Sequence, residues 1–259
     1  MLAELLEKIS AQGRSSFDLK DLQKLKKSSP SALRAAIYRS QMKHEIASPH
    51  RGFFCIIPPA YRSLRCIPAD QFIPDLMDHL RAVYYVGLLS AAEYHGAAHQ
   101  RPQVFQVVTG RARRPISCGG VAVEFVSKKK VDLTPTQQMN TRTGAIKVST
   151  PEATALDLVG YVHHCGGLNN VATVLSELSE SIDAVRLVGA AKLVPITWAQ
   201  RVGYLIDAAG AKEKTSDLAA YVNSKSPVRA SLSPGQAVKG AEMNKRWKLF
   251  LNTSVEADF

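Results

Sequence analysis

Residues 15–57, SSFDLKDLQKLKKSSPSALRAAIYRSQMKHEIASPHRGFFCII, decide the organisation of the first part of the chain. Apolar residues at helical spacing in SFDLKDLQKL predict a short helix, and Ser16 is expected to cap it. A further helix is expected to begin at Pro30, because Ser29 suits the N-cap position and proline is tolerated in the first turn. Strand-like residues then flank the segment 49–52, Pro-His-Arg-Gly, which predicts a hairpin with a basic tip.

The helix that begins at Pro30 has two different faces. Leu33, Ala36, Ile37 and Ser40 recur at helical spacing on one side. Serine, arginine, tyrosine and glutamine side chains occupy the other sides, as expected for a helix that reads the DNA major groove. The order of helix, capped helix and basic hairpin favours a winged helix-turn-helix. The alternative is an amphipathic helix in an ordinary bundle.

This interpretation assigns DNA contacts to three groups of side chains. Base edges or adjacent phosphates are assigned to Ser31, Arg34, Tyr38 and Gln41. Contacts to the sugar-phosphate backbone are assigned to Lys26, Lys27, Ser28, Ser29, Arg39 and Lys43. A minor-groove contact of the wing is assigned to His50 and Arg51.

Charge is distributed unevenly along the 259 residues. Residues 1–75 hold 12 basic and 7 acidic side chains, residues 76–150 hold 10 and 4, and residues 151–259 hold 11 of each. The whole formal excess of +11 therefore lies in the first 150 residues. A basic front half suits a polyanionic partner such as double-stranded DNA, through phosphate contacts and counterion release.

Other classes of protein lack support in the sequence. No apolar run approaches the roughly 20 residues of a membrane span. The opening MLAELLEKISAQ has an amphipathic helical pattern and not that of an export signal, so we expect a cytoplasmic protein without a membrane partner. The four cysteines are scattered, which indicates reduced thiols. Adjacent His163 and His164 point in different directions on a helix, and we expect no metal and no cofactor.

Prolines at 58, 59, 68 and 74 mark a connector between two domains. We expect a winged helix-turn-helix domain at residues 1–65 and a larger mixed α/β domain at residues 66–259. The second domain is predicted to contain strands in VFQVVTG and VAVEFVS, a turn at Gly119-Gly120, several helices and a closing strand after Asn244. One of these helices begins after Thr150 as its N-cap. The fold class is therefore α+β.

Two basic segments of the second domain have two interpretations. Arg111, Arg113 and Arg114 follow one predicted strand, and residues 128–130, Lys-Lys-Lys, follow the next. These side chains either form a second surface for anions or protect the edges of the sheet from pairing with other chains. The sequence does not distinguish the two.

The second domain resembles a known family in two segments. Residues 84–116, YYVGLLSAAEYHGAAHQRPQVFQVVTGRARRPI, and residues 149–159, STPEATALDLV, are similar to the AbiEi family, the antitoxins of type IV toxin-antitoxin systems. The first domain, from SFDLKDLQKL onward, resembles the winged-helix domain that precedes the antitoxin domain in this family. This resemblance implies an autorepressor that binds inverted repeats in its own promoter. It also implies that the second domain counteracts a nucleotidyltransferase-like toxin without a stable complex, and that it assists cooperative operator binding.

Two rival functions belong to other classes. A metal-dependent DNA nuclease would use acidic and lysine residues near the strand VEFVSKK, namely Glu93, Glu124, Asp132, Lys128 and Lys130. Their spacing lacks the Glu-x-Lys pattern of such nucleases, and we expect no catalytic site. A protein-interaction module would use the winged helix to contact another protein, and salt-insensitive binding without DNA retardation would favour it.

Overall fold

The computed structural model describes residues 2–23, 29–97, 102–225 and 228–256. These residues contain ten α-helices and three β-sheets, which confirms the mixed α+β class. The chain forms two compact units. The first consists of Met1–Tyr85, Gln103–Asp132 and Gln138–Lys147, and the second of Val86–Pro102, Leu133–Gln137 and Val148–Phe259.

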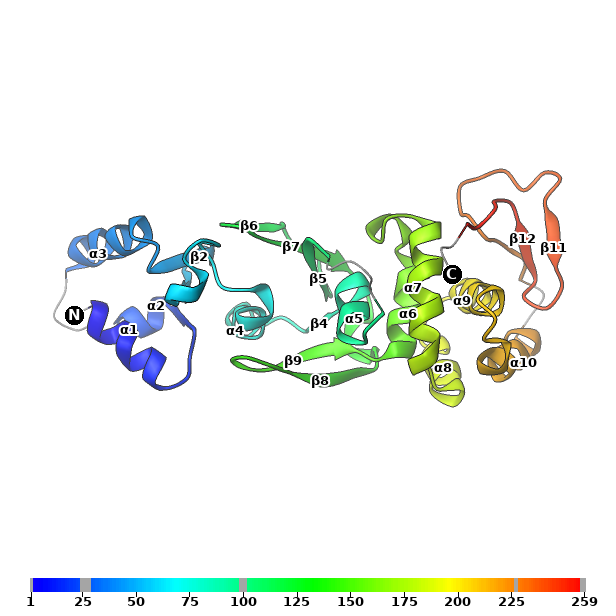
Figure 1. The fold of residues 1–259 in the computed structure, drawn as a ribbon, viewed down its shortest axis with the longest axis horizontal. Coiled ribbons are helices and arrows are strands. Elements are labelled where there is room, and N and C mark those ends of the chain that lie inside the picture. Colours follow the sequence, from blue (N-terminus) through cyan, green and yellow to red (C-terminus); the bar gives the residue numbers. More distant parts are fainter. Residues whose placement is uncertain (1, 24–28, 98–101, 226–227, 257–259) are drawn as a thin grey trace. The chain divides into compact units, whose positions relative to one another are not determined.

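Three helices and one small sheet form the first part of the first unit. The helices are α1 (Leu2–Ala11), α2 (Leu19–Gln23) and α3 (Pro30–Met42), drawn in blue in Figure 1. The strands are β1 (Ser16–Asp18), β2 (Ile46–His50) and β3 (Phe53–Ile56). They pair in the order β1-β3-β2, antiparallel throughout, so the hairpin expected around residues 49–52 is present.

The expectation that Ser16 caps a helix is wrong. Ser16 lies in β1 opposite Cys55, and its hydroxyl donates a hydrogen bond to the Asp75 carboxylate. Asp18 takes the capping role instead, because its carboxylate accepts hydrogen bonds from the backbone N–H groups of Lys20 (2.7 Å) and Asp21 (3.1 Å). The helix therefore begins at Leu19, after the strand.

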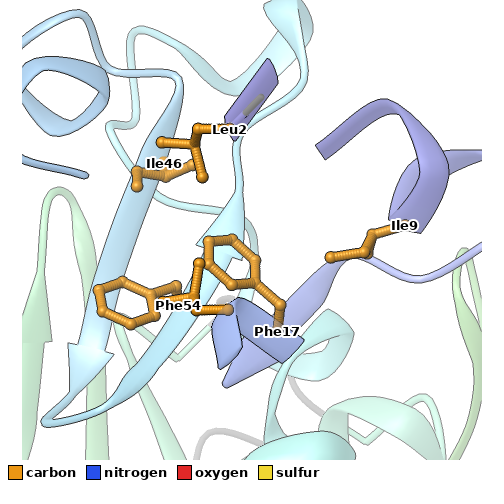
Figure 2. Packing of buried hydrophobic residues seen from close by; sticks show 6 residues of the cluster. Leu2, Ile9, Phe17, Ile46 and Phe54 are labelled. Carbon is orange, nitrogen blue, oxygen red and sulfur yellow. The ribbon is translucent and has the colours of Figure 1, made fainter. Parts of the chain in front are cut away.

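A single apolar cluster joins these helices to the sheet. Its buried members come from α1, β1, α2, β2 and β3, and five of them are labelled in Figure 2. They are Leu2, Ile9, Phe17, Leu22, Ile46 and Phe54. The rings of Phe17 and Phe54 are stacked with their centroids 5.2 Å apart. From α3, the partly buried Leu33, Ala36 and Ile37 pack against the cluster, as the sequence predicts.

The proline-rich connector contains two short 3-10 helices and one α-helix. They are η1 (Pro59–Tyr61), η2 (Ala69–Gln71) and α4 (Ile73–His79). A proline begins or precedes each of the two 3-10 helices. Ile73, Leu76 and Met77 bury the inner face of α4.

The largest sheet has six strands in the order β6-β7-β5-β4-β9-β8. Its strands are β4 (Tyr84–Val86), β5 (Val104–Thr109), β6 (Ile116–Cys118), β7 (Val121–Ser127), β8 (Thr136–Thr141) and β9 (Gly144–Ser149). The parallel pairs are β5 with β7 and β4 with β9, whereas β6 and β7 form an antiparallel hairpin. The turn between β6 and β7 is the predicted Gly119-Gly120.

Helices dominate the second unit (Figure 1). Its α-helices are α5 (Leu88–Tyr94), α6 (Pro151–Gly160), α7 (Leu168–Leu178), α8 (Ala184–Ala191), α9 (Ile196–Ala208) and α10 (Ser216–Ser224). The Thr150 hydroxyl accepts a hydrogen bond from the Ala153 N–H and so caps α6, as predicted. Short 3-10 helices, η3 to η6, occupy Val131–Leu133, Val162–His164, Ser179–Ser181 and Lys212–Thr215.

A three-stranded sheet completes the second unit. It consists of β10 (Ala230–Ser231), β11 (Glu242–Asn244) and β12 (Leu249–Leu251), in the order β10-β12-β11. The closing strand expected after Asn244 is thus only three residues long and follows a turn. Among the described residues, no helix is both long enough and apolar enough to span a membrane.

Candidate nucleic-acid interface

The local sequence around Ser29 determines where α3 begins. The Ser29 side-chain oxygen accepts a hydrogen bond from the Ala32 N–H at 3.2 Å, and Pro30 occupies the first turn. At the other end, the backbone N–H of Lys43 donates to carbonyl oxygens of the last turn, and His44 follows with a φ of +53°. The helix therefore has the cap and the start that the sequence predicts.

The outer face of α3 is exposed to solvent. Leu33, Ala36 and Ile37 hold the opposite side against the core. Ser31, Arg34 and Tyr38 lie outside, and the side chain of Tyr38 is 63% exposed. Positions 31, 34 and 38 are three or four residues apart, so they share one side of the helix. This side offers a hydroxyl, a guanidinium and a phenol for hydrogen bonding to bases or phosphates.

The other side chains assigned to DNA differ in their exposure. Gln41 is only partly exposed. Ser29, Arg39, Lys43, His50 and Arg51 are exposed. Lys26, Lys27 and Ser28 lie outside the residues that the structure describes.

The sequence interpretation did not include Met42, which is 64% exposed. Met42 follows Tyr38 by four residues, so the two side chains are neighbours on the helix surface. An exposed apolar pair beside Arg34 and Arg39 suits contact with thymine methyl groups, because the major groove presents these groups beside hydrogen-bonding atoms. The helical spacing from Tyr38 is the signal that identifies Met42.

Internal contacts fix the shape of the hairpin between β2 and β3. The Ser48 hydroxyl lies 3.0 Å from the His50 carbonyl oxygen and 3.1 Å from that of Phe53. The His50 Nδ1 lies 3.1 Å from the Arg51 carbonyl oxygen. Gly52 completes the turn with a φ of +78°, in the left-handed region that glycine adopts without strain. The exposed His50 and Arg51 are thus presented by a defined turn.

His79 of α4 packs beside this hairpin. Its ring centroid lies 5.6 Å from that of Phe53 and 6.4 Å from that of His50. The Nδ1 of His79 is 3.4 Å from a carboxylate oxygen of Asp18 in β1. These contacts hold the residues on either side of the hairpin turn and leave Arg51 in the turn exposed.

The second basic segment lies on the sheet of the first unit. Arg111, Arg114, Lys129 and Lys130 are exposed, and Arg114 directly precedes Pro115 and the edge strand β6. Lys128 is engaged internally, because its Nζ donates a hydrogen bond of 3.2 Å to the Tyr85 hydroxyl. This placement is compatible with both interpretations of the segment, as an anion-binding surface and as protection of a sheet edge.

The segment STPEATALDLV has a different character, because its polar side chains are buried. Glu152, Thr154 and Asp157 of α6 are at most 2% exposed. Glu152 Oε1 accepts a hydrogen bond of 3.1 Å from the Asp183 N–H at the start of α8. The hydroxyls of Ser149 and Thr154 are 2.6 Å apart. The segment therefore joins α6 to its neighbours and presents no open site.

His95 extends this buried polar group from the end of α5. Its Nε2 lies 2.7 Å from the Ser149 carbonyl oxygen, which requires a proton on that nitrogen. Burial lowers the pKa of His95, because a charged imidazolium loses its hydration there. A neutral His95 that donates to Ser149 joins the end of α5 to the start of α6.

Much of this region matches a known protein family. Residues 85–208 match the model of the AbiEi antitoxin C-terminal domain. This part of the chain is an AbiEi antitoxin domain. The match includes α5 with His95 and α6 with Glu152, Thr154 and Asp157. The AbiEi antitoxin domain thus uses the STPEATALDLV segment for its internal packing.

Solved structures support the fold over a longer range than the AbiEi antitoxin domain. The crystal structure of the Rv2827c protein from Mycobacterium tuberculosis is similar over 95% of this chain and 89% of that chain, with a TM-score of 0.69 and 15% sequence identity. A nucleotidyltransferase-like protein from Paracoccidioides brasiliensis gives a TM-score of 0.30, with 12% identity over 59% of this chain and 89% of that chain. This score is too low to indicate a common fold. A search of curated proteins gave no match.

Members of the AbiEi antitoxin family are typically not enzymes, and membership of an antitoxin family implies a cognate toxin. The acidic residue considered for a nuclease, Glu124, accepts a hydrogen bond of 3.2 Å from the Gln106 side chain of the neighbouring strand β5. No group of three or more histidine, cysteine, aspartate or glutamate side chains that could hold a metal ion occurs in the described part of the chain.

Proposed function

We propose that this protein is a DNA-binding autorepressor and the antitoxin of a type IV toxin-antitoxin system. Residues 1–65 form a winged helix-turn-helix that binds inverted repeats in the promoter of its own operon. Residues 66–259 form the antitoxin domain, which counteracts a nucleotidyltransferase-like toxin without a stable complex. The protein acts in the cytoplasm.

The observation that carries the DNA-binding half is the exposed outer face of α3 beside a basic hairpin. The helices and strands follow the order α1-β1-α2-α3-β2-β3, which is the order expected of a winged helix-turn-helix. In such a module the second helix of the pair enters the major groove. Here that helix is α3, and it presents Ser31, Arg34 and Tyr38.

Each exposed group then has a distinct role on the operator. Ser31, Arg34, Tyr38 and Gln41 contact base edges or adjacent phosphates. Lys26, Lys27, Ser28, Ser29, Arg39 and Lys43 contact the sugar-phosphate backbone. His50 and Arg51 of the wing enter the minor groove, where a guanidinium is attracted by the concentrated negative potential.

The antitoxin half rests on the family of residues 85–208. Residues 151–259 carry equal numbers of basic and acidic side chains, so they lack the excess charge that a second DNA-binding domain requires. The described polar groups of the STPEATALDLV segment are internal. Toxin neutralisation therefore depends on the folded domain. The residues of this segment support neutralisation by stabilising the fold of that domain.

The Arg34→Ala variant tests the DNA-binding half. Removal of a guanidinium that contacts a base costs about 1–3 kcal/mol, which corresponds to roughly 5- to 150-fold weaker operator binding. Binding to random DNA of the same length should weaken less. The measurement is fluorescence anisotropy with labelled duplexes that contain the promoter repeats or a scrambled sequence, at one fixed salt concentration.

Arg186→Ala is the matched control, because Arg186 is exposed on α8 and its loss changes the net charge equally. This variant should bind the operator like the unchanged protein. Equal losses of Arg34→Ala on both duplexes would make Arg34 a phosphate contact, and no loss would remove Arg34 from the interface. If the protein cleaved plasmid DNA in the presence of Mg²⁺ and Glu124→Ala abolished this cleavage, the protein would instead be a metal-dependent nuclease.

A further inference from the structure

Two thiols of the first unit face each other. Cys66 lies in the connector after η1 and is completely buried, whereas Cys118 ends β6 and is partly exposed. Each thiol shifts the pKa of the other, so the two side chains lie within interaction range. All four cysteines of the chain are free thiols in this structure. Neither thiol has a role in the proposed DNA or toxin functions.

The backbone around the two thiols sets their spacing. The Gly120 N–H donates a hydrogen bond of 2.8 Å to the Leu64 carbonyl oxygen, and Gly119 lies against the backbone of Arg65. These two contacts hold residues 64–65 against residues 119–120, so Cys66 directly follows one side of the contact and Cys118 directly precedes the other. A disulfide requires Cα atoms roughly 4.4–6.8 Å apart, a separation that segments in direct backbone contact can reach.

The two thiols have different acidities. A hydrogen bond from the Cys66 thiol, with a further one from the backbone N–H of Ser48, lowers the pKa of Cys118 despite its partial burial. The same contact and its burial raise the pKa of Cys66. Cys118 is therefore the more acidic of the two thiols, and it is also the one that solvent reaches, so it is the better placed of the two to act as the nucleophile. Cys66 is placed behind it as the second thiol.

We propose that Cys66 and Cys118 are a redox-active pair that hydrogen peroxide or an organic hydroperoxide oxidises to an intramolecular disulfide. The Cys118 thiolate attacks one peroxide oxygen, the O–O bond breaks, and a sulfenic acid forms on Cys118 while the other oxygen leaves as water or alcohol. The Cys66 sulfur then attacks the Cys118 sulfur, and the S–O bond breaks. Water leaves with the proton of Cys66, so two thiols lose two electrons to one peroxide.

The position of the pair connects it with the hairpin. Ser48, whose N–H donates to Cys118, lies in β2 and also holds the hairpin through its hydroxyl. Oxidation of Cys118 changes the acceptor of this N–H from a thiol sulfur to a disulfide sulfur. The disulfide itself, however, is independent of DNA binding, so it can be tested whether or not the proposed operator binding is correct.

The test uses the purified full-length protein treated with hydrogen peroxide and then analysed without reduction. The intact mass should fall by two hydrogen atoms, and peptide mapping should join the peptide of Cys66 to that of Cys118. In Cys66→Ser the reaction should stop at the sulfenic acid, which dimedone traps on residue 118. In Cys118→Ser neither the disulfide nor the dimedone adduct should form.

Cys165→Ser is the matched control, because Cys165 is a buried thiol of the second unit. It should oxidise like the unchanged protein. A disulfide that includes the buried Cys55 or Cys165, a link between two chains, or a dimedone adduct on Cys66 would overturn the proposal. So would an unchanged mass of the native chain after peroxide treatment, which is decisive even where a variant fails to fold.

Discussion

Gly119 shows how one residue without a side chain allows two segments to meet. Its φ of +58° lies in the left-handed region, and a Cβ atom there would lie 2.2 Å from the Leu64 carbonyl oxygen. The adjacent Arg65 also has a positive φ, of +57°. Both segments of this contact therefore have a residue in the left-handed backbone conformation. Glycine satisfies the conformation and the close approach at the same time.

The Gly119→Ala substitution should lower the free energy of unfolding by more than the conformational penalty of alanine alone. An alanine at positive φ costs about 1–2 kcal/mol. The clash with backbone atoms of the connector should add about 1–3 kcal/mol, because they cannot move as a flexible side chain does. The control is Gly13→Ala, since Gly13 has a φ of +73° and no atom within 4 Å of an added Cβ.

Urea unfolding followed by circular dichroism measures both variants against the unchanged chain. The midpoint should fall clearly further for Gly119→Ala than for Gly13→Ala. Equal midpoints for the two variants would show that the connector yields at no cost and that its contact with the β6–β7 turn is weak.

Residues whose role is local could be predicted, and residues whose role depends on distant partners could not. Ser29 and Thr150 cap their helices through N–H groups only three residues away, so the sequence around them is sufficient. Ser16 has an equally suitable side chain for a cap. Its pairing with Cys55 in the sheet, however, involves residues far along the chain and overrides the local preference.

At the scale of elements, Trp247 contributes a buried contact between α9 and the last sheet, beside the hydrogen bonds of Gln200 and Arg201 to the same region. Trp247 is fully buried, and its indole N–H donates a hydrogen bond of 2.8 Å to the Asp207 carboxylate in α9. Its ring rests on Gly203, where an added Cβ would lie 2.1 Å from it. The turn before β12 thus reaches α9 through a space that only glycine leaves open.

The Trp247→Ala substitution should therefore cost about 3–5 kcal/mol, through the lost burial and the cavity that remains. It also leaves the Asp207 carboxylate without its indole donor. Trp198→Ala is the comparison, because Trp198 lies in the same unit but is only partly buried. Thermal unfolding followed by circular dichroism should show the larger decrease for Trp247→Ala. Similar decreases would mean that the Trp247 contact is not the main link between α9 and the last sheet.

Strong periodicity made some elements predictable, and its absence hid others. The strands β5 and β7 are apolar and bounded by turn residues, so both were expected from the sequence. In β8 the residues TQQMNT are almost entirely polar, and only pairing within the sheet makes them a strand. Strict alternation with Val121 and Val123 would turn Phe125 of β7 inward, but Phe125 is only partly buried, whereas Val126 beside it is buried.

On the scale of the whole molecule, the sequence and the structure separate two sets of residues. The exposed face of α3 lies outside residues 85–208, which the AbiEi antitoxin domain covers. The formal charge excess lies in the first 150 residues, and residues 151–259 are balanced. The charge pattern and the family resemblance were visible in the sequence. The exposure of each α3 side chain was not, because it depends on which residues the core covers.

This separation predicts that repression and toxin neutralisation can be lost independently. Under the proposed function, Arg34→Ala should relieve repression of a reporter driven by the protein's own promoter, because α3 loses a proposed contact with the operator. The same variant, expressed from an unrelated promoter together with the toxin of the neighbouring gene, should still restore growth, because the AbiEi antitoxin domain is unchanged. Arg186→Ala retains α3 and should repress normally. If Arg34→Ala at equal protein levels failed to restore growth, neutralisation would itself require α3, and the two functions would share one surface.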